Sequence, residues 1–277
     1  MKRRSKKIAI GALVAAGFLA AAFDVRLSVV NYELSADQIH TPVRLALVSD
    51  LHSCRYGKDQ KDLIARLDAQ KPDIVLLGGD IFDDVFPTEN TKAFLRAAAE
   101  KYPCYYVTGN HEYRSNAISQ LLKWIDTHSV HRLAGTFDTV TVKGQTLRIC
   151  GVDDPDAGAY SNSDFAEQLE QLKAVNGDGV YTVLLAHRPE RIDEYLPCGF
   201  DLILCGHAHG GQVRIPGLLN GLFAPDQGLF PKYAGGKYSF ENNTTMIVSR
   251  GLARESTGAP RVFNRPELVI VDLVPKG

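Results

Sequence analysis

The sequence predicts an α/β domain with mixed sheets at its centre and helices outside them. Short runs rich in valine, isoleucine and leucine recur along the chain, as expected for strands covered on both faces. Stretches with apolar residues at helical spacing lie between these runs. The composition agrees: 45% of the 277 residues are hydrophobic and 23% are charged, which excludes a disordered or fibrous chain.

Each predicted element follows from its local pattern. The near-continuous apolar runs predict strands at 43–48, 74–77, 104–107, 147–150, 181–186 and 202–205. Helical spacing predicts helices at 61–69, 91–101, 116–126 and 164–175. Two further patterns complete the domain: a hairpin that joins 138–142 to 147–150 through Lys143-Gly144-Gln145, and carboxyl-terminal strands at 244–249 and 268–273.

The amino-terminal residues 1–24 differ from the rest of the chain. Residues 8–23, IAIGALVAAGFLAAAF, carry no charge and follow five basic residues. The run of 16 residues is short of the roughly 20 that cross a bilayer, but it suits a thin one. We expect a signal anchor, because helix-forming alanines continue without a break; an export signal cut after Ala22 is the alternative.

The basic cluster also predicts topology. Positive charge stays in the cytoplasm, so the rest of the chain is expected outside it, either anchored to the membrane or secreted if the segment is cleaved. Residues 25–42 would form a linker and a first strand, and residues 43–277 one domain.

A net charge of −1 for the whole chain argues against a nucleic-acid binder that works by bulk charge. The five cysteines show no CxxC spacing, so we expect buried free thiols rather than a disulfide framework.

Polar clusters follow five of the predicted strands, at the point where each strand ends. The clusters are Ser49-Asp50-Leu51-His52, Gly78-Gly79-Asp80-Ile81-Phe82-Asp83, Thr108-Gly109-Asn110-His111-Glu112, His187, and Gly206-His207-Ala208-His209-Gly210-Gly211. The first three recur every 30 residues, the length of one βαβ unit. Parallel strands end at the same edge of a sheet, so these loops are expected to converge on one site.

The residue types in these loops indicate a metal site. Carboxylates, imidazoles and one amide oxygen form a mixed nitrogen and oxygen set without thiolate, which favours Mn, Fe, Zn or Mg over a structural zinc. Seven such side chains are too many for one tetrahedral ion. They fit two ions that share a bridging carboxylate.

The motifs D-x-H, G-D-x-x-D, G-N-H-E, a lone histidine and G-H-x-H occur in this order. In this respect the chain, from about residue 43 to its end, resembles the calcineurin-like metallophosphoesterase superfamily. The longer forms AHRPE at 186–190, CGHAHGGQV at 205–213 and FNRPE at 263–267 resemble an exported or membrane-anchored bacterial branch. That branch includes enzymes likened to UDP-2,3-diacylglucosamine pyrophosphatases.

The resemblance implies a four-layer α-β-β-α sandwich that holds two divalent metal ions, with Mn, Fe or Zn expected first and Mg as a further option. The implied ligands are Asp50, His52 and His209 for one ion, Asn110, His187 and His207 for the other, and Asp80 as the bridge. His111 would assist the leaving group, and Asp83 would orient His111. A metal-bridging hydroxide would attack phosphorus in line.

We therefore expect a phosphoric ester hydrolase of the phosphodiesterase or pyrophosphatase type, with a lipid-linked or nucleotide-linked ester among the candidate substrates. The alternative is a non-catalytic cell-envelope binding module on the same scaffold. A metallopeptidase is disfavoured because no H-E-x-x-H occurs. The sequence does not indicate an oligomeric state.

Several other residues are expected to lie outside the chemistry. His40, His128 and His131 follow no strand-end motif, Asp84 is interpreted as a solvated neighbour, and residues 153–156 as a turn. The loop 215–230 is unusually apolar.

We expect the large side chains of the loop 215–230 to pack inward; the alternative is that they form a rim that contacts acyl chains near a membrane. Arg250 is assigned equally to a phosphate contact or to a surface ion pair.

Overall fold

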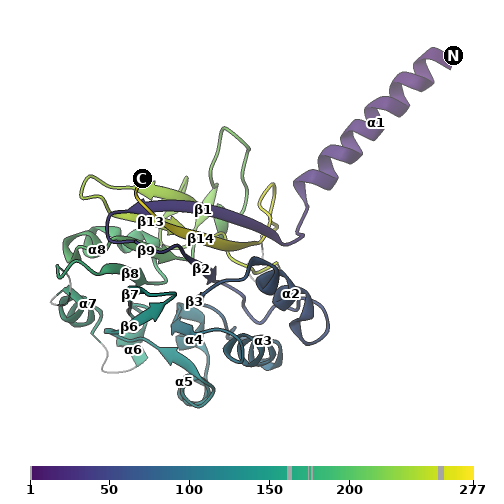
Figure 1. Cartoon of the computed structure of the whole chain (residues 1–277). Coiled ribbons are helices and arrows are strands. Elements are labelled where there is room, and N and C mark those ends of the chain that lie inside the picture. Colours follow the sequence, from purple (N-terminus) through teal and green to yellow (C-terminus); the bar gives the residue numbers. More distant parts are fainter. Residues whose placement is uncertain (1, 161–163, 174, 176, 255–258) are drawn as a thin grey trace.

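The computed structural model describes residues 2–160, 164–173, 175, 177–254 and 259–277. One residue of the predicted helix at 164–175, residue 174, lies outside the described residues. The described chain forms two six-stranded sheets and a small two-stranded one (Figure 1). The predicted α/β class is confirmed, with both large sheets mixed.

The first sheet carries the amino-terminal motifs. Its strands, in spatial order, are β1 (Ser28–Ala36), β14 (Glu267–Pro275), β2 (Val43–Val48), β3 (Ile74–Gly78), β4 (Cys104–Val107) and β5 (Val130–Arg132). Strands β2 to β5 run parallel, whereas β14 is antiparallel to β2 and parallel to β1. The carboxyl ends of β2, β3 and β4, and with them the first three motifs, therefore lie at one edge.

The second sheet carries the remaining motifs. Its order is β12 (Gly236–Ser239), β13 (Thr245–Val248), β9 (Leu202–Cys205), β8 (Tyr181–Leu185), β7 (Gln145–Gly151) and β6 (Thr136–Val142). Strands β7, β8, β9 and β13 are parallel. The small sheet pairs β10 (Phe223–Ala224) with β11 (Gly228–Leu229).

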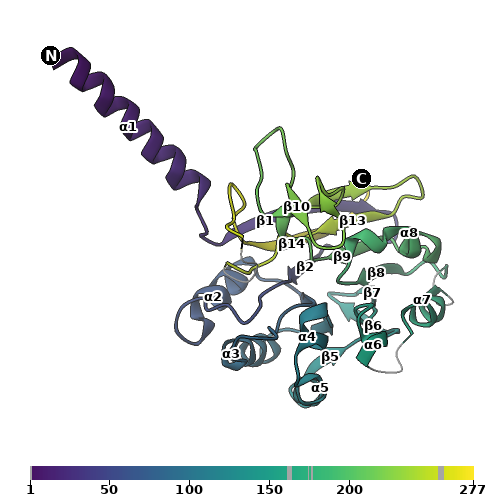
Figure 2. The same ribbon diagram turned by 180° about the vertical axis from the view of Figure 1, so that it is seen from behind.

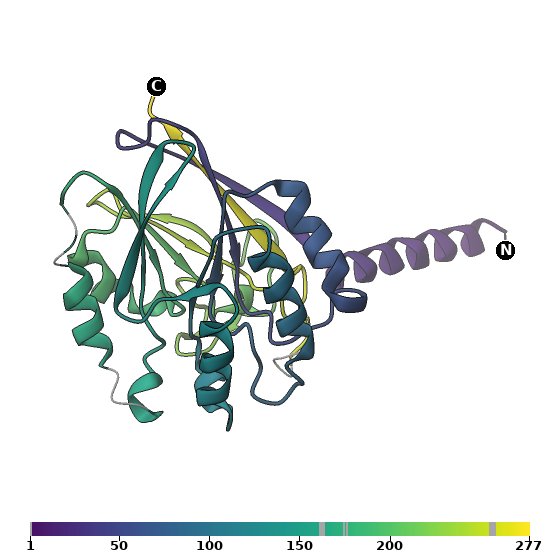
Figure 3. The same cartoon turned by 60° about the horizontal axis from the view of Figure 1, so that its bottom comes forward.

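The helices lie outside the two sheets (Figure 3). The α-helices are α1 (Lys2–Ala22), α2 (Lys61–Gln70), α3 (Glu89–Ala99), α4 (Asn110–Arg114), α5 (Ile118–Asp126), α6 (Ala157–Tyr160), α7 (Phe165–Lys173) and α8 (Ile192–Tyr195). Short 3-10 helices are η1 (Lys58–Gln60), η2 (Pro189–Arg191), η3 (Leu196–Cys198) and η4 (His209–Gly211). Helices α2, α3 and α5 cover the first sheet, and α7 and α8 cover the second.

Strand alternation explains why the strands read as continuous apolar runs. In β2, Leu45 and Leu47 point into the core between the sheets, whereas Ala46 and Val48 point toward the helices. Each strand is thus buried on both faces, and a fully buried leucine contributes roughly 1.5–3 kcal/mol. Three apolar layers result, one between the sheets and one under each set of helices. This is the predicted four-layer sandwich.

The predicted hairpin is present, with a shorter turn than expected. Lys143 and Gly144 have φ values of 53° and 82°, as in a two-residue turn of the mirror-image type that matches strand twist. Gln145, which the sequence placed in the turn, is the first residue of β7. Its side-chain oxygen accepts a hydrogen bond from the His40 backbone N–H at 2.7 Å.

Helix α1 projects away from the body of the molecule (Figures 1 and 2). Its carboxyl end is fixed to the domain, because the Ala22 carbonyl accepts a hydrogen bond from the Phe263 N–H at 2.6 Å. Among the described residues, no helix is both long and apolar enough to cross a membrane. The expected signal anchor stays a prediction.

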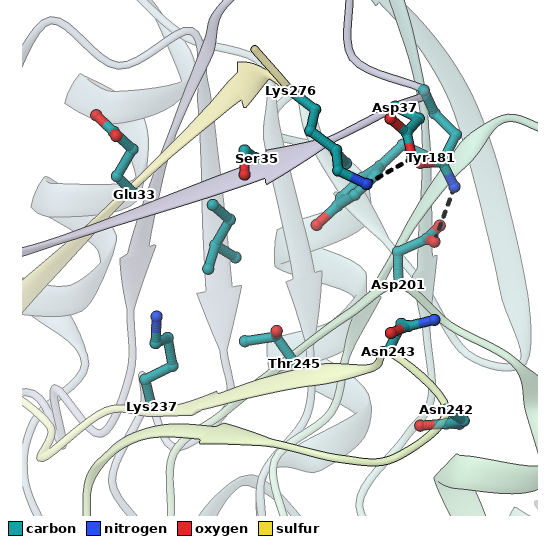
Figure 4. A pocket seen from close by; sticks show the side chains of 13 residues that line it. Glu33, Ser35, Asp37, Tyr181, Asp201, Lys237, Asn242, Asn243, Thr245 and Lys276 are labelled. Carbon is teal, nitrogen blue, oxygen red and sulfur yellow. Dashed lines mark hydrogen bonds and ion pairs between the residues drawn. The ribbon is translucent and has the colours of Figure 1, made fainter.

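A polar groove of about 580 Å³ lies between β1 and the strands β12 and β13 (Figure 4). Asp37 and Lys276 form an ion pair across its rim at 3.1 Å. Tyr181 and Thr245 line it at the amino ends of β8 and β13. The groove therefore lies at the opposite end of the second sheet from the strand-end motifs.

Candidate metal centre

The five strand-end loops meet, and they bring all seven predicted metal ligands into one buried cluster. Each of the seven is at most 3% exposed: Asp50, His52, Asp80, Asn110, His187, His207 and His209. Ligand atoms of Asp50, His52 and His209 lie within 4.8 Å of one another, and so do those of Asp80, His187 and His207. These two groups match the two predicted ion sites except for Asn110, which lines a cavity together with Asp80, His207 and His209.

Asp80 lies between the two groups. Its Oδ2 atom is 3.5 Å from His52 Nε2 and 3.2 Å from His187 Nε2. Its Oδ1 atom accepts a hydrogen bond from the His111 backbone N–H at 2.8 Å. One oxygen is thus fixed by the backbone, and the other faces an imidazole of each group.

The site contains buried polar atoms that need a partner. Among the described residues, His52 Nε2, Asp80 Oδ2, Asn110 Oδ1 and His209 Nδ1 are buried without a hydrogen-bond partner. Such orphaned groups cost roughly 1–3 kcal/mol each unless something binds them. All four belong to the predicted ligands, and oxygen and imidazole nitrogen suit divalent ions of the Mn, Fe and Zn type. The residues therefore fit metal ions.

Hydrogen bonds behind the ligands fix their orientation. His187 Nδ1 donates to the Gly78 carbonyl at 2.8 Å, which leaves Nε2 free to face Asp80. Asp50 accepts from the Ser49 hydroxyl at 2.6 Å and from the His207 N–H at 2.9 Å. The His187 ring and the Asp50 carboxylate are thereby held in place before any ion binds.

The electrostatics of the cluster also indicate a cation site. Burial lowers the pKa of His187, but the carboxylates of Asp80 and Asp50 outweigh it and raise the pKa to about 10. Burial raises the pKa of Asp80, but the charges of His187 and His52 hold it well below its usual value. Without metal, protons on imidazole thus balance the carboxylates. Bound divalent ions would take over that role.

The backbone at the ligands is strained. Five predicted ligands have φ between 45° and 66°, a left-handed conformation that costs residues other than glycine about 1 kcal/mol or more: Asp50, His52, Asp80, His207 and His209. Two glycines leave room for Asp50. A Cβ at Gly206 would lie 2.5 Å from the Asp50 carboxylate, and one at Gly251 would lie 2.6 Å from the Asp50 Cβ.

Asp83, which is predicted to orient His111, lies within ion-pair distance of that ring but nearer to His52. Asp83 Oδ2 lies 3.0 Å from His52 Nδ1 and 3.7 Å from His111 Nδ1. The close partner of His111 is Asp84, whose Oδ1 lies 2.7 Å from the same nitrogen. The D-x-x-D spacing cannot distinguish the two adjacent aspartates, because a loop turns their side chains in different directions. Asp84, interpreted as a solvated neighbour, thus contacts the site.

Asp83→Asn and Asp84→Asn are expected to have separable effects. Asp83→Asn should weaken metal binding about 10- to 100-fold, because a carboxylate behind a histidine ligand sets its orientation and basicity. Asp84→Asn should lower kcat about tenfold and leave metal affinity unchanged, since its partner His111 is not a predicted ligand. Isothermal titration with Mn²⁺ and steady-state kinetics distinguish the two. Equal effects of both variants on metal affinity would contradict the assignment.

Glu112 is a site residue whose role the sequence did not reveal. Its Oε1 accepts from the N–H groups of Ile81 and Phe82 and from the Tyr106 hydroxyl, at 2.8–3.0 Å. Its Oε2 accepts from the N–H groups of Asp80 and Gly109, at 3.0 and 2.8 Å. This one carboxylate therefore joins the loops after β3 and β4. The only sequence signal was the final letter of the G-N-H-E motif.

A second set of residues behind His207 was also missed. Arg188 donates to Asp154 at 2.6 and 2.9 Å and forms an ion pair with Asp226. Asp226 Oδ2 lies 2.8 Å from His207 Nε2, so the opposite nitrogen, Nδ1, faces His187. The hydrogen bond from His207, aided by the Arg188 charge, lowers the pKa of Asp226 to about 2. In the sequence, the sign of this set was Arg188, which lies in the A-H-R-P-E motif.

A cavity of about 280 Å³ opens over the cluster and is lined by Asp80, Asn110, His111, Arg114, His207, His209, Gln212, Phe223, Pro225 and Ala259. Phe223 is half-exposed at the rim of this cavity and did not pack inward as expected, and neither did Leu218, which is 82% exposed.

Arg250, for which the sequence left a phosphate contact and an ion pair open, forms an ion pair with buried Glu267 at 2.5 Å. All five cysteines are buried and none of them forms a disulfide bond, so the predicted absence of a disulfide framework is confirmed.

Comparison with known proteins supports the same chemistry. The family model of the calcineurin-like phosphoesterases matches residues 43–211. An uncharacterized metallophosphoesterase of Aquifex aeolicus is 31% identical over 91% of this chain and 93% of its own length. Phosphodiesterase YaeI of Escherichia coli is 28% identical over 84% of this chain and 83% of its own length.

Solved structures show the same fold at low identity. The NAD nucleotidase NadN of Haemophilus influenzae aligns over 77% of this chain with a TM-score of 0.54 and 17% identity. A 5'-nucleotidase precursor of Thermus thermophilus aligns over 77% with a TM-score of 0.51 and 16% identity. The chain spans about half the length of each. Family match, relatives and buried ligand cluster agree, so this chain is a metal-dependent phosphohydrolase and belongs to the calcineurin-like phosphoesterase family.

Proposed function

We propose that the protein hydrolyses phosphodiesters or pyrophosphates at a centre of two divalent ions. The observation that supports this most strongly is the position of Asp80 Oδ2, which is buried between His52 Nε2 and His187 Nε2 at 3.5 and 3.2 Å. When bound, the ions would supply positive charge to the phosphoryl oxygens and make a water nucleophilic near neutral pH. Mn, Fe or Zn suits the ligands best, with Mg as a further option.

The side chains of the protein would hold the two ions and supply a proton to the leaving group. Asp50, His52 and His209 would hold one ion, and Asn110, His187 and His207 the other, with Asp80 shared. His111 Nδ1 is paired with Asp84 at 2.7 Å, while its ring lines the cavity over the cluster. Its second nitrogen is thus available to donate a proton to the leaving oxygen.

His111→Ala tests this role most directly. It should lower kcat for bis-p-nitrophenyl phosphate about 100-fold or more, the range for loss of a general acid. Metal content, measured by mass spectrometry, should be unchanged because His111 is outside the ligand set. His131→Ala, an exposed histidine paired with Asp138, is the matched control and should keep full activity. Unchanged turnover in His111→Ala would remove the assigned acid.

The identity of the ester is a further proposal. The relative named a phosphodiesterase favours a diester, and half-exposed Phe223 at the cavity rim offers apolar contact to its second substituent. Lipid-linked and nucleotide-linked esters are both candidates. A screen of phosphodiesters, nucleotide diphosphates and phospholipids with Mn²⁺ would rank them. Hydrolysis of monoesters alone would contradict a diesterase.

The geometry does not favour the non-catalytic binding module. A binding module has no need of His111, an imidazole that lies outside the predicted ligand set and that the Asp84 carboxylate holds at the cavity.

We also propose, from the basic cluster that precedes residues 8–23, that the catalytic domain lies outside the cytoplasm. A protease-accessibility assay on spheroplasts tests that location, and protection of the domain would contradict it.

A further inference from the structure

A hollow of about 490 Å³ lies beside the point where α1 leaves the domain. It is lined by Arg214, Arg250 and Phe263 together with the turn at residues 215–220, and the metal ligands are not among its lining residues. The turn belongs to a green loop that projects on the side from which α1 leaves (Figures 1 and 2). Neither the fold nor the catalytic proposal explains its composition.

The two arginines carry more positive charge than their surroundings balance. A Cβ at Gly235 would lie 2.9 Å from the Arg250 Cγ and 3.2 Å from Arg214 Nη1, so both side chains meet over this glycine. Glu267 balances Arg250. Arg214 hydrogen-bonds to the neutral Asn220, and its Nη1 is buried without a partner among the described residues. Burial, and then the Arg250 charge, lower the pKa of Arg214.

Exposed apolar side chains surround these arginines. Leu218 is 82% exposed at the tip of a turn in which the N–H groups of Leu218 and Leu219 donate to the Ile215 carbonyl at 2.9 and 2.8 Å. The turn therefore holds Leu218 in solvent. On α1, Phe18 is 62% exposed while its ring packs on Phe263 at 5.2 Å. Phe263 lines the hollow together with the apolar turn, so the end of α1 reaches the rim of the hollow through the contact between Phe18 and Phe263.

This combination indicates an amphiphilic partner. Guanidinium groups bind phosphate oxygens in a planar, bidentate way. Apolar side chains next to basic ones are typical of surfaces that enter the boundary between lipid headgroups and acyl chains. A soluble anion would explain the arginines but not Leu218 and Phe18, whereas an apolar protein partner would explain the leucine but not Arg214.

We propose that this face docks on an anionic phospholipid bilayer, with a headgroup phosphate at Arg214 and Arg250 and with Leu218 inserted among the acyl chains. The α1 helix need not cross the bilayer for this contact. The same loop continues from Gln212 at the catalytic cavity to Phe223 at its rim, so docking would bring the cavity close to the lipid surface. The inference requires neither metal nor turnover and is independent of the proposed function.

A fluorophore at position 218 tests the contact. All five native cysteines are buried, so Leu218→Cys can be labelled with an environment-sensitive dye in the full chain. Vesicles of phosphatidylglycerol and phosphatidylcholine should shift the emission to the blue and raise it at least about twofold. The same dye at Thr139→Cys, on β6 at the far edge of the second sheet from β12, should not respond. Every variant keeps α1, so binding through α1 alone does not produce the difference.

Arg214→Gln in the labelled chain tests the headgroup contact. It should require about fivefold more anionic lipid for half of the shift, since one arginine contributes about 1 kcal/mol near an anionic surface. Arg191→Gln, which removes a half-exposed arginine paired with Glu194, should not change the requirement. An unshifted dye on vesicles that carry bound protein would overturn the inference. So would an Arg214-independent shift, or the same Arg214-dependent response to inorganic phosphate alone.

Discussion

Asp80→Asn should lower kcat/KM for bis-p-nitrophenyl phosphate at least about a thousandfold. The asparagine keeps the side-chain shape and can still accept the hydrogen bond from the His111 N–H. It removes the negative oxygen that faces both His52 and His187. A metal centre contributes several kcal/mol of transition-state stabilisation, and each 1.4 kcal/mol is about tenfold in rate.

The accompanying change in metal content makes the test specific. Asp80→Asn should bind less metal than the unmodified protein, and its thermal stability without metal should also fall, because His187 and His52 lose the buried carboxylate that balances their charge. Asp126→Asn, an exposed aspartate paired with Arg132, is the matched control and should keep both activity and metal. Activity within tenfold of normal in Asp80→Asn would contradict a shared bridging ligand.

Glu112→Gln should lower the free energy of unfolding by about 2–4 kcal/mol. The buried carboxylate accepts four backbone N–H groups and the Tyr106 hydroxyl. A glutamine has one acceptor oxygen, so its amide group must face N–H donors and leave at least two of them unpaired. Unsatisfied buried donors cost roughly 1–3 kcal/mol each. Chemical denaturation of the metal-free protein measures the loss.

Glu100→Gln provides the control for Glu112→Gln. Glu100 is exposed at the carboxyl end of α3, and its replacement should change stability by no more than about 0.5 kcal/mol. A loss below about 1 kcal/mol in Glu112→Gln would show that the loops after β3 and β4 do not depend on this carboxylate. Metal affinity should also fall in Glu112→Gln, because the backbone N–H of the predicted ligand Asp80 donates to the Glu112 carboxylate.

Much of the fold and the contents of the ligand cluster could be predicted from the sequence. Strands such as β2 and β9 are apolar on both faces, so their boundaries stand out, and the motifs that follow them are confined to one edge by parallel pairing. Short elements were missed. Helix α4 has five residues, too few to show helical spacing, and it begins inside the G-N-H-E motif.

The connections behind the ligands could not be predicted. Whether Asp83 or Asp84 lies closer to His111 depends on the dihedral angles of the loop, which a spacing pattern does not specify. Asp226 lies in the turn between the short antiparallel strands β10 and β11, and only the fold brings it to His207. The inward packing expected for Leu218 was wrong because hydrophobicity alone does not tell a buried loop from one held in solvent.

Titration of metal-free protein with Mn²⁺, while hydrolysis of bis-p-nitrophenyl phosphate is followed, shows how many bound ions turnover requires. The buried ligand cluster predicts no turnover in the chelated protein and activity that rises with added metal to a plateau at two equivalents per chain. Full turnover in the chelated protein, or two bound equivalents without turnover, would contradict a two-metal phosphohydrolase.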